Sequence, residues 1–117
     1  MEKTKIIGIS IALEKHAKKK KEQIWKAMAK EIQKPRKRMP SINLTRIGKL
    51  AQQFDKKTLF VPGKILGTGA LGVSVFVVGL EFSKNARKKI VDAKGKAWEI
   101  KEFLETDPVK SSVVIVK

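Results

Sequence analysis

Three glycines occur at the spacing of a dinucleotide-binding loop. Gly67, Gly69 and Gly72 spell G-x-G-x-x-G within the stretch GKILGTGALGVSVFVVGLEF. Such a loop binds a pyrophosphate because it leads into the N-terminus of a helix, whose N–H groups face the anion. Here VSVFVVGL follows Gly72, and it is apolar on both alternating faces, so we expect a buried strand in place of that helix. We therefore predict no cofactor, and attribute the glycines to positive φ angles and tight turns.

Acid–base and metal chemistry have few candidates in this sequence. Glu99, Glu102 and Glu105 recur every three residues, which is typical of the solvated face of a short helix. His16 is the only histidine and there is no cysteine, so no standard zinc ligand set exists. For His16 we expect a surface or packing role. The sequence predicts no enzyme, no metal site and no small-molecule substrate.

Lysine and arginine provide the strongest functional signal. The chain has 27 Lys and Arg against 11 Asp and Glu, a formal net charge of +16, and 15 of the basic residues fall within residues 1–50. A charge of this size favours a polyanionic partner, and nucleic acid is the usual one. Both tryptophans lie on apolar faces, so we expect contact with phosphates and with the shape of folded nucleic acid more than stacking of single strands.

The basic residues form three clusters in the N-terminal half. Four consecutive lysines span about 300° of helix rotation, so they either fan around a helix or lie in a loop between helices. A second cluster lies in KPRKRMPS, which we interpret as an extended loop stiffened by two prolines, and a third lies on the helix after it. The predicted nucleic-acid contacts in these clusters are Lys18, Lys19, Lys20, Lys21, Lys34, Arg36, Lys37, Arg38, Arg46 and Lys49.

The elements that carry these clusters are predicted to be helical. Residues 6–17 place apolar side chains on one helical face, although residues 7–13 also alternate as in a strand. Residues 24–32 form a second helix that ends before Pro35, and Asn43 caps a third helix that extends to Phe54. Three helical segments are thus expected before the first strong strand signal.

The only long apolar run near the start of the chain covers residues 6–13. It is far shorter than the roughly 20 residues needed to cross a bilayer. Lysines follow it where a signal peptide would have a small-residue cleavage site. We expect neither export nor a membrane span, and the absence of cysteine agrees with a cytoplasmic protein.

From Thr58 onward strands alternate with helices. Residues 58–61 and 64–66 are predicted as two short strands separated by a Pro62-Gly63 turn. A buried strand follows, and then a helix that Ser83 caps and Gly95 terminates. A short strand at residues 97–98, a short helix at 99–105 and a closing strand at 112–116 complete the chain. The alternation indicates an α/β fold in a single domain, with a basic helical extension and loop at 1–57 and an α/β core at 58–117.

Several separated motifs, in order, resemble one known family. IWKAMAKEIQKPRKR, NLTRIGKL, VPGKILGTG and FSKNARKKI are similar to segments of large-subunit ribosomal protein eighteen of archaea and eukaryotes, a family related to the C-terminal part of bacterial ribosomal protein fifteen. The resemblance covers the chain from about residue 24 to its end, and the compact length resembles the archaeal members.

That resemblance implies a non-catalytic structural component of the large ribosomal subunit. Its partners are then large-subunit ribosomal RNA and neighbouring ribosomal proteins, and its location is the ribosome in the cytoplasm. The implied fold is an irregular β-β-α superhelix preceded by helices and a basic extension. The resemblance also implies that the KPRKR segment and Arg46 face RNA, and it adds Lys64 in the VPGK segment as a further contact. From the residues alone, a basic chromatin-type DNA-binding protein is the alternative.

Overall fold

The chain folds into two N-terminal helices followed by a mixture of strands and helices. The computed structural model describes residues 3–34, 40–54, 57–106 and 113–116, with side chains from Ile6 onward. Within these ranges, the α/β class predicted from the sequence is confirmed. The elements, in chain order, are α1 (Lys3–Lys20), α2 (Gln23–Gln33), β1 (Ser41–Asn43), α3 (Leu44–Gln53), β2 (Thr58–Leu66), β3 (Phe76–Phe82), α4 (Lys84–Asp92), β4 (Lys96–Glu99), α5 (Ile100–Glu105) and β5 (Val113–Ile115).

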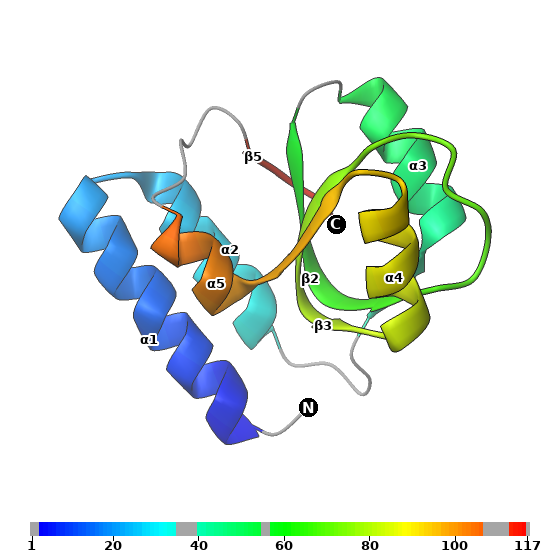
Figure 1. Cartoon of the computed structure of the whole chain (residues 1–117). Coiled ribbons are helices and arrows are strands. Elements are labelled where there is room, and N and C mark those ends of the chain that lie inside the picture. Colours follow the sequence, from blue (N-terminus) through cyan, green and yellow to red (C-terminus); the bar gives the residue numbers. More distant parts are fainter. Residues whose placement is uncertain (1–2, 35–39, 55–56, 107–112, 117) are drawn as a thin grey trace.

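A parallel sheet forms the centre of the molecule (Figure 1). Its strand order is β1-β2-β3-β4, with β5 pairing only with β2. β3 occupies one edge of β2 along most of its length. The other edge is shared, because β5 pairs with residues 58–60 and β1 pairs with residues 64–66. A gap at residues 61–63 therefore separates the two short strands.

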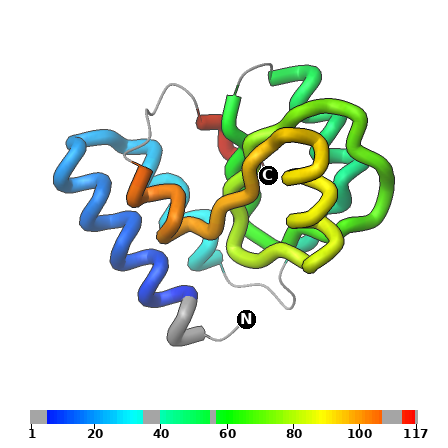
Figure 2. Tube along the Cα trace, viewed as in Figure 1, coloured from blue at the N-terminus to red at the C-terminus, as the bar shows by residue number. Residues whose placement is uncertain are grey.

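Helices cover both faces of the sheet, as the Cα trace in Figure 2 also shows. α1, α2 and α5 pack on one face around buried Trp25, Leu13 and Phe60. α3 and α4 pack on the other face around Leu59, Ile65 and Ile90. The N-terminal segment is helical, which resolves the helix-or-strand ambiguity of residues 7–13; Ile9 and Leu13 face the core, while Ile7 and Ile11 are about half exposed.

β2 and β3 are joined by an unusual crossover. Because the two strands are parallel, with Thr58 beside Phe76, the chain must return along the whole length of β2 before β3 begins. This return covers about 25 Å, and residues 67–75 reach about 30 Å when fully extended. The connection is usually made by a helix. Here the glycine-rich segment makes the connection instead, passing close to the start of α3 at Gly69 and to the start of α4 at Gly67.

The structure corrects two sequence predictions about strands. Pro62 and Gly63 were predicted to form a turn between two strands, but β2 is continuous through them. β2 has one residue more than β3 between the Val61–Gly79 and Lys64–Glu81 pairs, which is a β-bulge. A proline is tolerated at a bulge because the bulged residue does not have to donate a hydrogen bond to the neighbouring strand. A three-residue strand, β1, also precedes α3; it begins at Ser41, the last residue of the segment predicted as an extended loop, and no strand was predicted there.

The predicted helix caps are confirmed. The side-chain oxygens of Asn43 and Ser83 accept hydrogen bonds from the backbone N–H groups of Arg46 and Ala86 at 3.0 and 3.1 Å. The end of α4 differs from the prediction, because Lys94 and not Gly95 has the left-handed backbone, with φ of 63°. The N–H of Gly95 closes the motif by donating to the carbonyl of Ile90 at 2.9 Å. Among the described helices, none is long and apolar enough to cross a membrane.

Candidate nucleic-acid interface

The four consecutive lysines lie where α1 turns into α2. Lys18, Lys19 and Lys20 form the last turn of α1, and Lys21 follows with a left-handed φ of 56°. The run thus lies partly around the end of a helix and partly in the turn between two helices, which are the two arrangements considered from the sequence. Three cations at the C-terminus of a helix also interact favourably with its dipole, so these lysines stabilise α1 as well as carrying charge. We call residues 18–21 the turn patch.

The other predicted contacts within the described residues lie at the end of α2, on α3 and on β2. Lys34 follows the last residue of this helix, and Arg46 and Lys49 are exposed on α3. Lys64 is half-buried in β2, where its backbone N–H donates to the carbonyl of Pro40 at 2.9 Å. We call Lys34, Arg46, Lys49 and Lys64 the junction patch. Arg36, Lys37 and Arg38 lie outside the described residues.

A cavity of about 320 Å³ brings Lys34 and Arg46 together. It opens at the gap between β1 and β5 on the edge of β2. The Nζ of Lys34 forms an ion pair with Oε1 of Glu31 at 2.9 Å, and the Glu31 side chain is only 8% exposed, so a buried carboxylate holds this lysine at the mouth. The lining residues are Glu31, Lys34, Pro40, Ser41, Ile42, Arg46, Val61, Pro62 and Val116.

The two patches are about 16 Å apart along the axis of α2. Lys26 and Lys30 are exposed on this helix, and the spacing of four residues from Lys26 to Lys34 places all three near one face. They form a basic row between the patches. Lys26 and Lys30 were not among the contacts predicted from the sequence, although their spacing of four residues was visible in the helix pattern.

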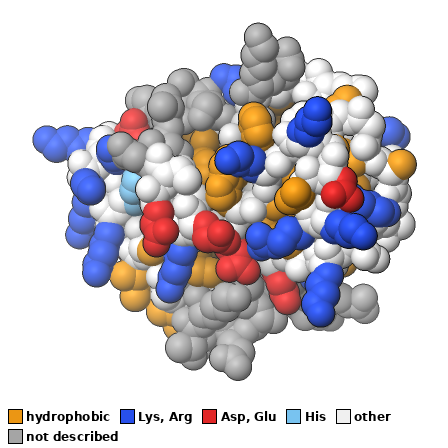
Figure 3. Space-filling model, in the orientation of Figure 1, with side chains coloured by type: hydrophobic (Ala, Val, Ile, Leu, Met, Phe, Trp, Pro, Cys, Tyr) orange, Lys and Arg blue, Asp and Glu red, His pale blue; other side chains and the backbone are white. Residues whose placement is uncertain are grey.

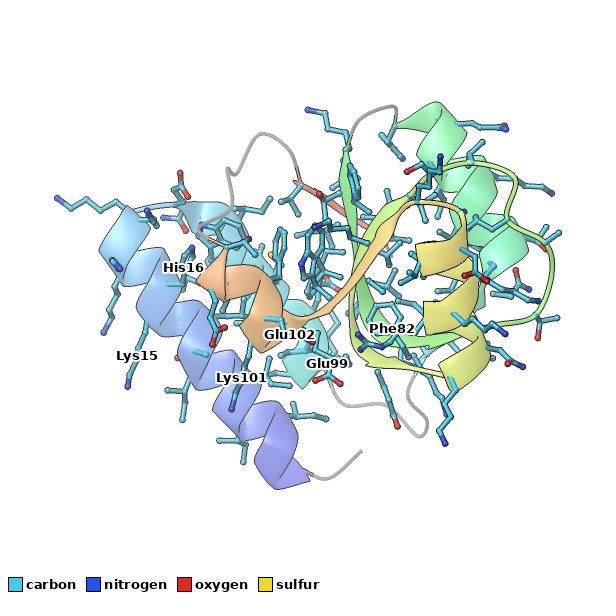
Figure 4. The ribbon with its side chains drawn as sticks, viewed as in Figure 1. Lys15, His16, Phe82, Glu99, Lys101 and Glu102 are labelled. Atoms are coloured by element: carbon cyan, nitrogen blue, oxygen red, sulfur yellow. The ribbon has the colours of Figure 1, made fainter. Side chains whose placement is uncertain are left out.

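Acidic side chains gather on the face that α5 presents (Figure 3). Glu102 lies on this helix, Glu99 precedes it as its N-cap at the end of β4, and Lys101 lies between them in the sequence (Figure 4). The carboxylate of Glu102 accepts a hydrogen bond from the backbone N–H of Glu99 at 3.3 Å, so it caps α5. Among the described residues, no group of three or more acidic or histidine side chains is placed to hold a metal ion.

His16 has the packing role expected from the sequence. It is half-buried, and its ring meets the ring of Trp25 edge-on with the centroids 4.8 Å apart. Figure 4 shows it on α1 facing α5. His16 therefore belongs to the contact between these helices.

Glycines in the segment 67–72 allow a positive φ angle and a close approach of the backbone to α4, in line with the backbone role predicted for them. Residues 73–75 after Gly72 are not helical and lead directly into β3. Gly69 has φ of +94°. A Cβ at Gly67 would lie 2.6 Å from the Cβ of Asn85 and 2.8 Å from the backbone nitrogen of Ala86, so only glycine allows the crossover to pass the start of α4.

Lys89 links this crossover to α4 through hydrogen bonds. Its Nζ donates to the carbonyl oxygens of Gly67 at 2.7 Å and Gly69 at 2.9 Å. The Oγ of Ser83 accepts from the N–H of Gly67 at 3.1 Å, in addition to capping α4. Lys89 is thus engaged in hydrogen bonds within the protein.

Replacing Lys89 by Met is expected to lower the free energy of unfolding by about 1 kcal/mol, because two carbonyls lose a charged donor at an exposed position. Lys88→Met, one residue earlier on the exposed face of α4, removes the same charge and is the matched control. Urea denaturation of both variants measures the difference. Equal stabilities for the two variants would show that the Lys89 hydrogen bonds contribute nothing.

Comparison with known proteins places this arrangement in context. The model of a family described as ribosomal proteins 50S-L15, 50S-L18e, 60S-L27A matches residues 20–98. The large ribosomal subunit protein eL18 of Methanoregula boonei is 34% identical over 119 residues, covering 100% of this chain and 97% of the relative. The protein of the same name from Sulfurisphaera tokodaii is 42% identical over 87 residues, covering 74% of this chain and 72% of the relative.

Proposed function

The chain belongs to the ribosomal protein L15/L18e family, and from this premise we propose that it is a structural constituent of the large ribosomal subunit that binds ribosomal RNA. The role is architectural and involves no catalysed reaction. It places the protein in the ribosome, in the cytoplasm, with large-subunit ribosomal RNA and neighbouring ribosomal proteins as partners. The relatives that support this assignment come from archaea.

The observation that carries the RNA-binding part of the proposal is the basic row along α2. This row joins the turn patch to the junction patch, so one continuous stretch of phosphate backbone can follow it. A surface of this kind gains affinity by neutralising phosphates and releasing their counterions. The proposed contacts are Lys18, Lys19, Lys20, Lys21, Lys26, Lys30, Lys34, Arg36, Lys37, Arg38, Arg46, Lys49 and Lys64.

Binding to archaeal large-subunit ribosomal RNA is expected to weaken steeply with salt. If 6–10 phosphates are contacted, the affinity falls about 10³-fold or more between 50 and 200 mM salt. Filter binding over a salt series measures this slope. Competition with duplex DNA at fixed salt then separates the two proposed nucleic-acid classes. Equal competition by duplex DNA would favour the chromatin-type alternative over the ribosomal role.

A further inference from the structure

Neutralising phosphates requires only exposed cations, so it does not account for the cavity at the junction of β1, β2 and β5. β5 ends its pairing with β2 at Phe60, and β1 begins its pairing at Lys64. Between them, Pro62 has no N–H to offer to a neighbouring strand. The bulge in β2 and the break between the two short strands therefore leave an opening on the sheet edge, which the end of α2 and the start of α3 border.

Two different kinds of surface meet in this opening. Its wall is apolar, with the buried side chains of Ile42, Val61 and Val116 beside the rings of Pro40 and Pro62. Its rim carries Lys34 and Arg46, and the ion pair with Glu31 fixes the first of these at the mouth. An occupant of matching chemistry has a flat apolar part and an anionic part close to it.

We propose that the cavity takes one unpaired nucleotide of the bound RNA, with its base against the proline and aliphatic wall and its phosphate beside Lys34 and Arg46. This inference rests on the proposed RNA-binding function and specifies one of its contacts. At about 320 Å³ the cavity is near the lower end of the range for small-molecule sites, so it suits a single base. Bases that are splayed out of a helix are also the usual targets of RNA recognition by proteins.

The occupant is a nucleotide and not a protein side chain because of the two cations. The lining has two positive charges, on Lys34 and Arg46, against one negative charge on Glu31. An apolar protein side chain does not necessarily have an anionic group beside it. Every unpaired nucleotide carries a phosphate next to its base. A side chain of a neighbouring ribosomal protein is the competing occupant, and the test below separates the two.

Ser41→Phe tests the proposal by filling the cavity without changing any charge. Ser41 lines the cavity but is exposed in β1, a position where a strand accepts an aromatic residue. Ser74→Phe is the control that adds the same ring away from the cavity, and it also removes the hydrogen bond from the Oγ of Ser74 to the carbonyl of Lys94. Ser74 is also exposed, in the loop before β3, at the opposite end of β2 from β1. Melting temperatures of both variants are compared with the parent protein first, and Ser41→Leu replaces Ser41→Phe if the larger ring prevents folding.

The readout is base-specific chemical probing of deproteinised archaeal large-subunit ribosomal RNA in complex with each variant. We expect the parent protein and Ser74→Phe to protect at least one unpaired base. Ser41→Phe should return that base to the reactivity of free RNA and weaken binding about 10-fold, the loss expected for one base contact. Protections of the RNA backbone should persist.

Three results would contradict the inference in different ways. If Ser41→Phe binds with unchanged affinity and base protections, RNA binding stands but no nucleotide enters the cavity. If Ser41→Phe fails only in assembly with whole subunits and not on deproteinised RNA, the occupant is a protein side chain. If the parent protein does not bind the RNA, the proposed function itself fails and the inference fails with it.

Discussion

Changing Arg36, Arg38 and Arg46 together to Glu is expected to lower the affinity for archaeal large-subunit ribosomal RNA by about 100-fold or more at 0.1 M salt. Each arginine that neutralises a phosphate contributes close to one unit to the slope of log affinity against log salt, so the slope should also fall by roughly 2–3. Arg46 is exposed on α3, so its replacement has little effect on packing. Fluorescence anisotropy with labelled RNA over a salt series measures affinity and slope together.

The control for this experiment carries the same change of charge elsewhere. Lys84, Lys88 and Lys101 are exposed on α4 and α5, and their joint change to Glu alters the net charge equally. Because exposed charges beyond about 10 Å are largely screened at 0.1 M salt, we expect this control to lose less than about tenfold. Equal losses for the two triple variants would mean that binding follows net charge and that the interface is not where we place it.

Trp25→Ala should have the largest effect on stability, a loss of about 3–5 kcal/mol in the free energy of unfolding. Trp25 is fully buried, and its Nε1 donates to Oε1 of Glu22 at 2.7 Å. Its ring also contacts His16 of α1 and faces Phe103 of α5. Removing the indole therefore opens a cavity where three helices meet the sheet. Because small domains are stabilised by only about 5–15 kcal/mol, this is a large share of the total.

Trp98 provides a matched comparison for the same substitution. It is only half-buried, and its ring lies between those of Phe76 and Phe103. We expect Trp98→Ala to lower the free energy of unfolding by about 1–2 kcal/mol, because folding buries less apolar surface of Trp98 than of Trp25. Urea denaturation followed by circular dichroism measures both variants. A larger loss for Trp98→Ala than for Trp25→Ala would contradict our description of the core.

Local chemistry in the sequence predicted the elements well. Asn43 and Ser83 cap helices as their side chains suggested, because capping depends on bonds only three residues away. The absence of a helix after Gly72 was also predictable from the β-branched residues that follow it. For the candidate site, the sequence indicated which residues are basic, and Lys34 and Arg46 do meet at one cavity.

Features set by distant partners were not predictable in the same way. The bulge at Pro62 lies in the pairing of β2 with β3, and no short segment carries the register of two strands so far apart in sequence. Parallel pairing and the cavity beside it depend on the same long-range contacts. The hydrogen bonds of Lys89 to Gly67 and Gly69 also join residues far apart in sequence, so this lysine resembled any other surface charge.

The sheet can be completed only after β5, the last described element of the chain, has been synthesised. β5 follows every other described element along the chain, yet it pairs with Thr58–Phe60 in the middle of the sheet. Until β5 arrives, this part of β2 is an open strand edge, the kind of surface that pairs with other chains. Contacts between such distant segments also slow folding. While the chain is being synthesised there is thus an interval in which the proposed RNA-binding surface exists but the sheet is incomplete, and under the proposed function early binding of RNA would shorten the exposure of that edge.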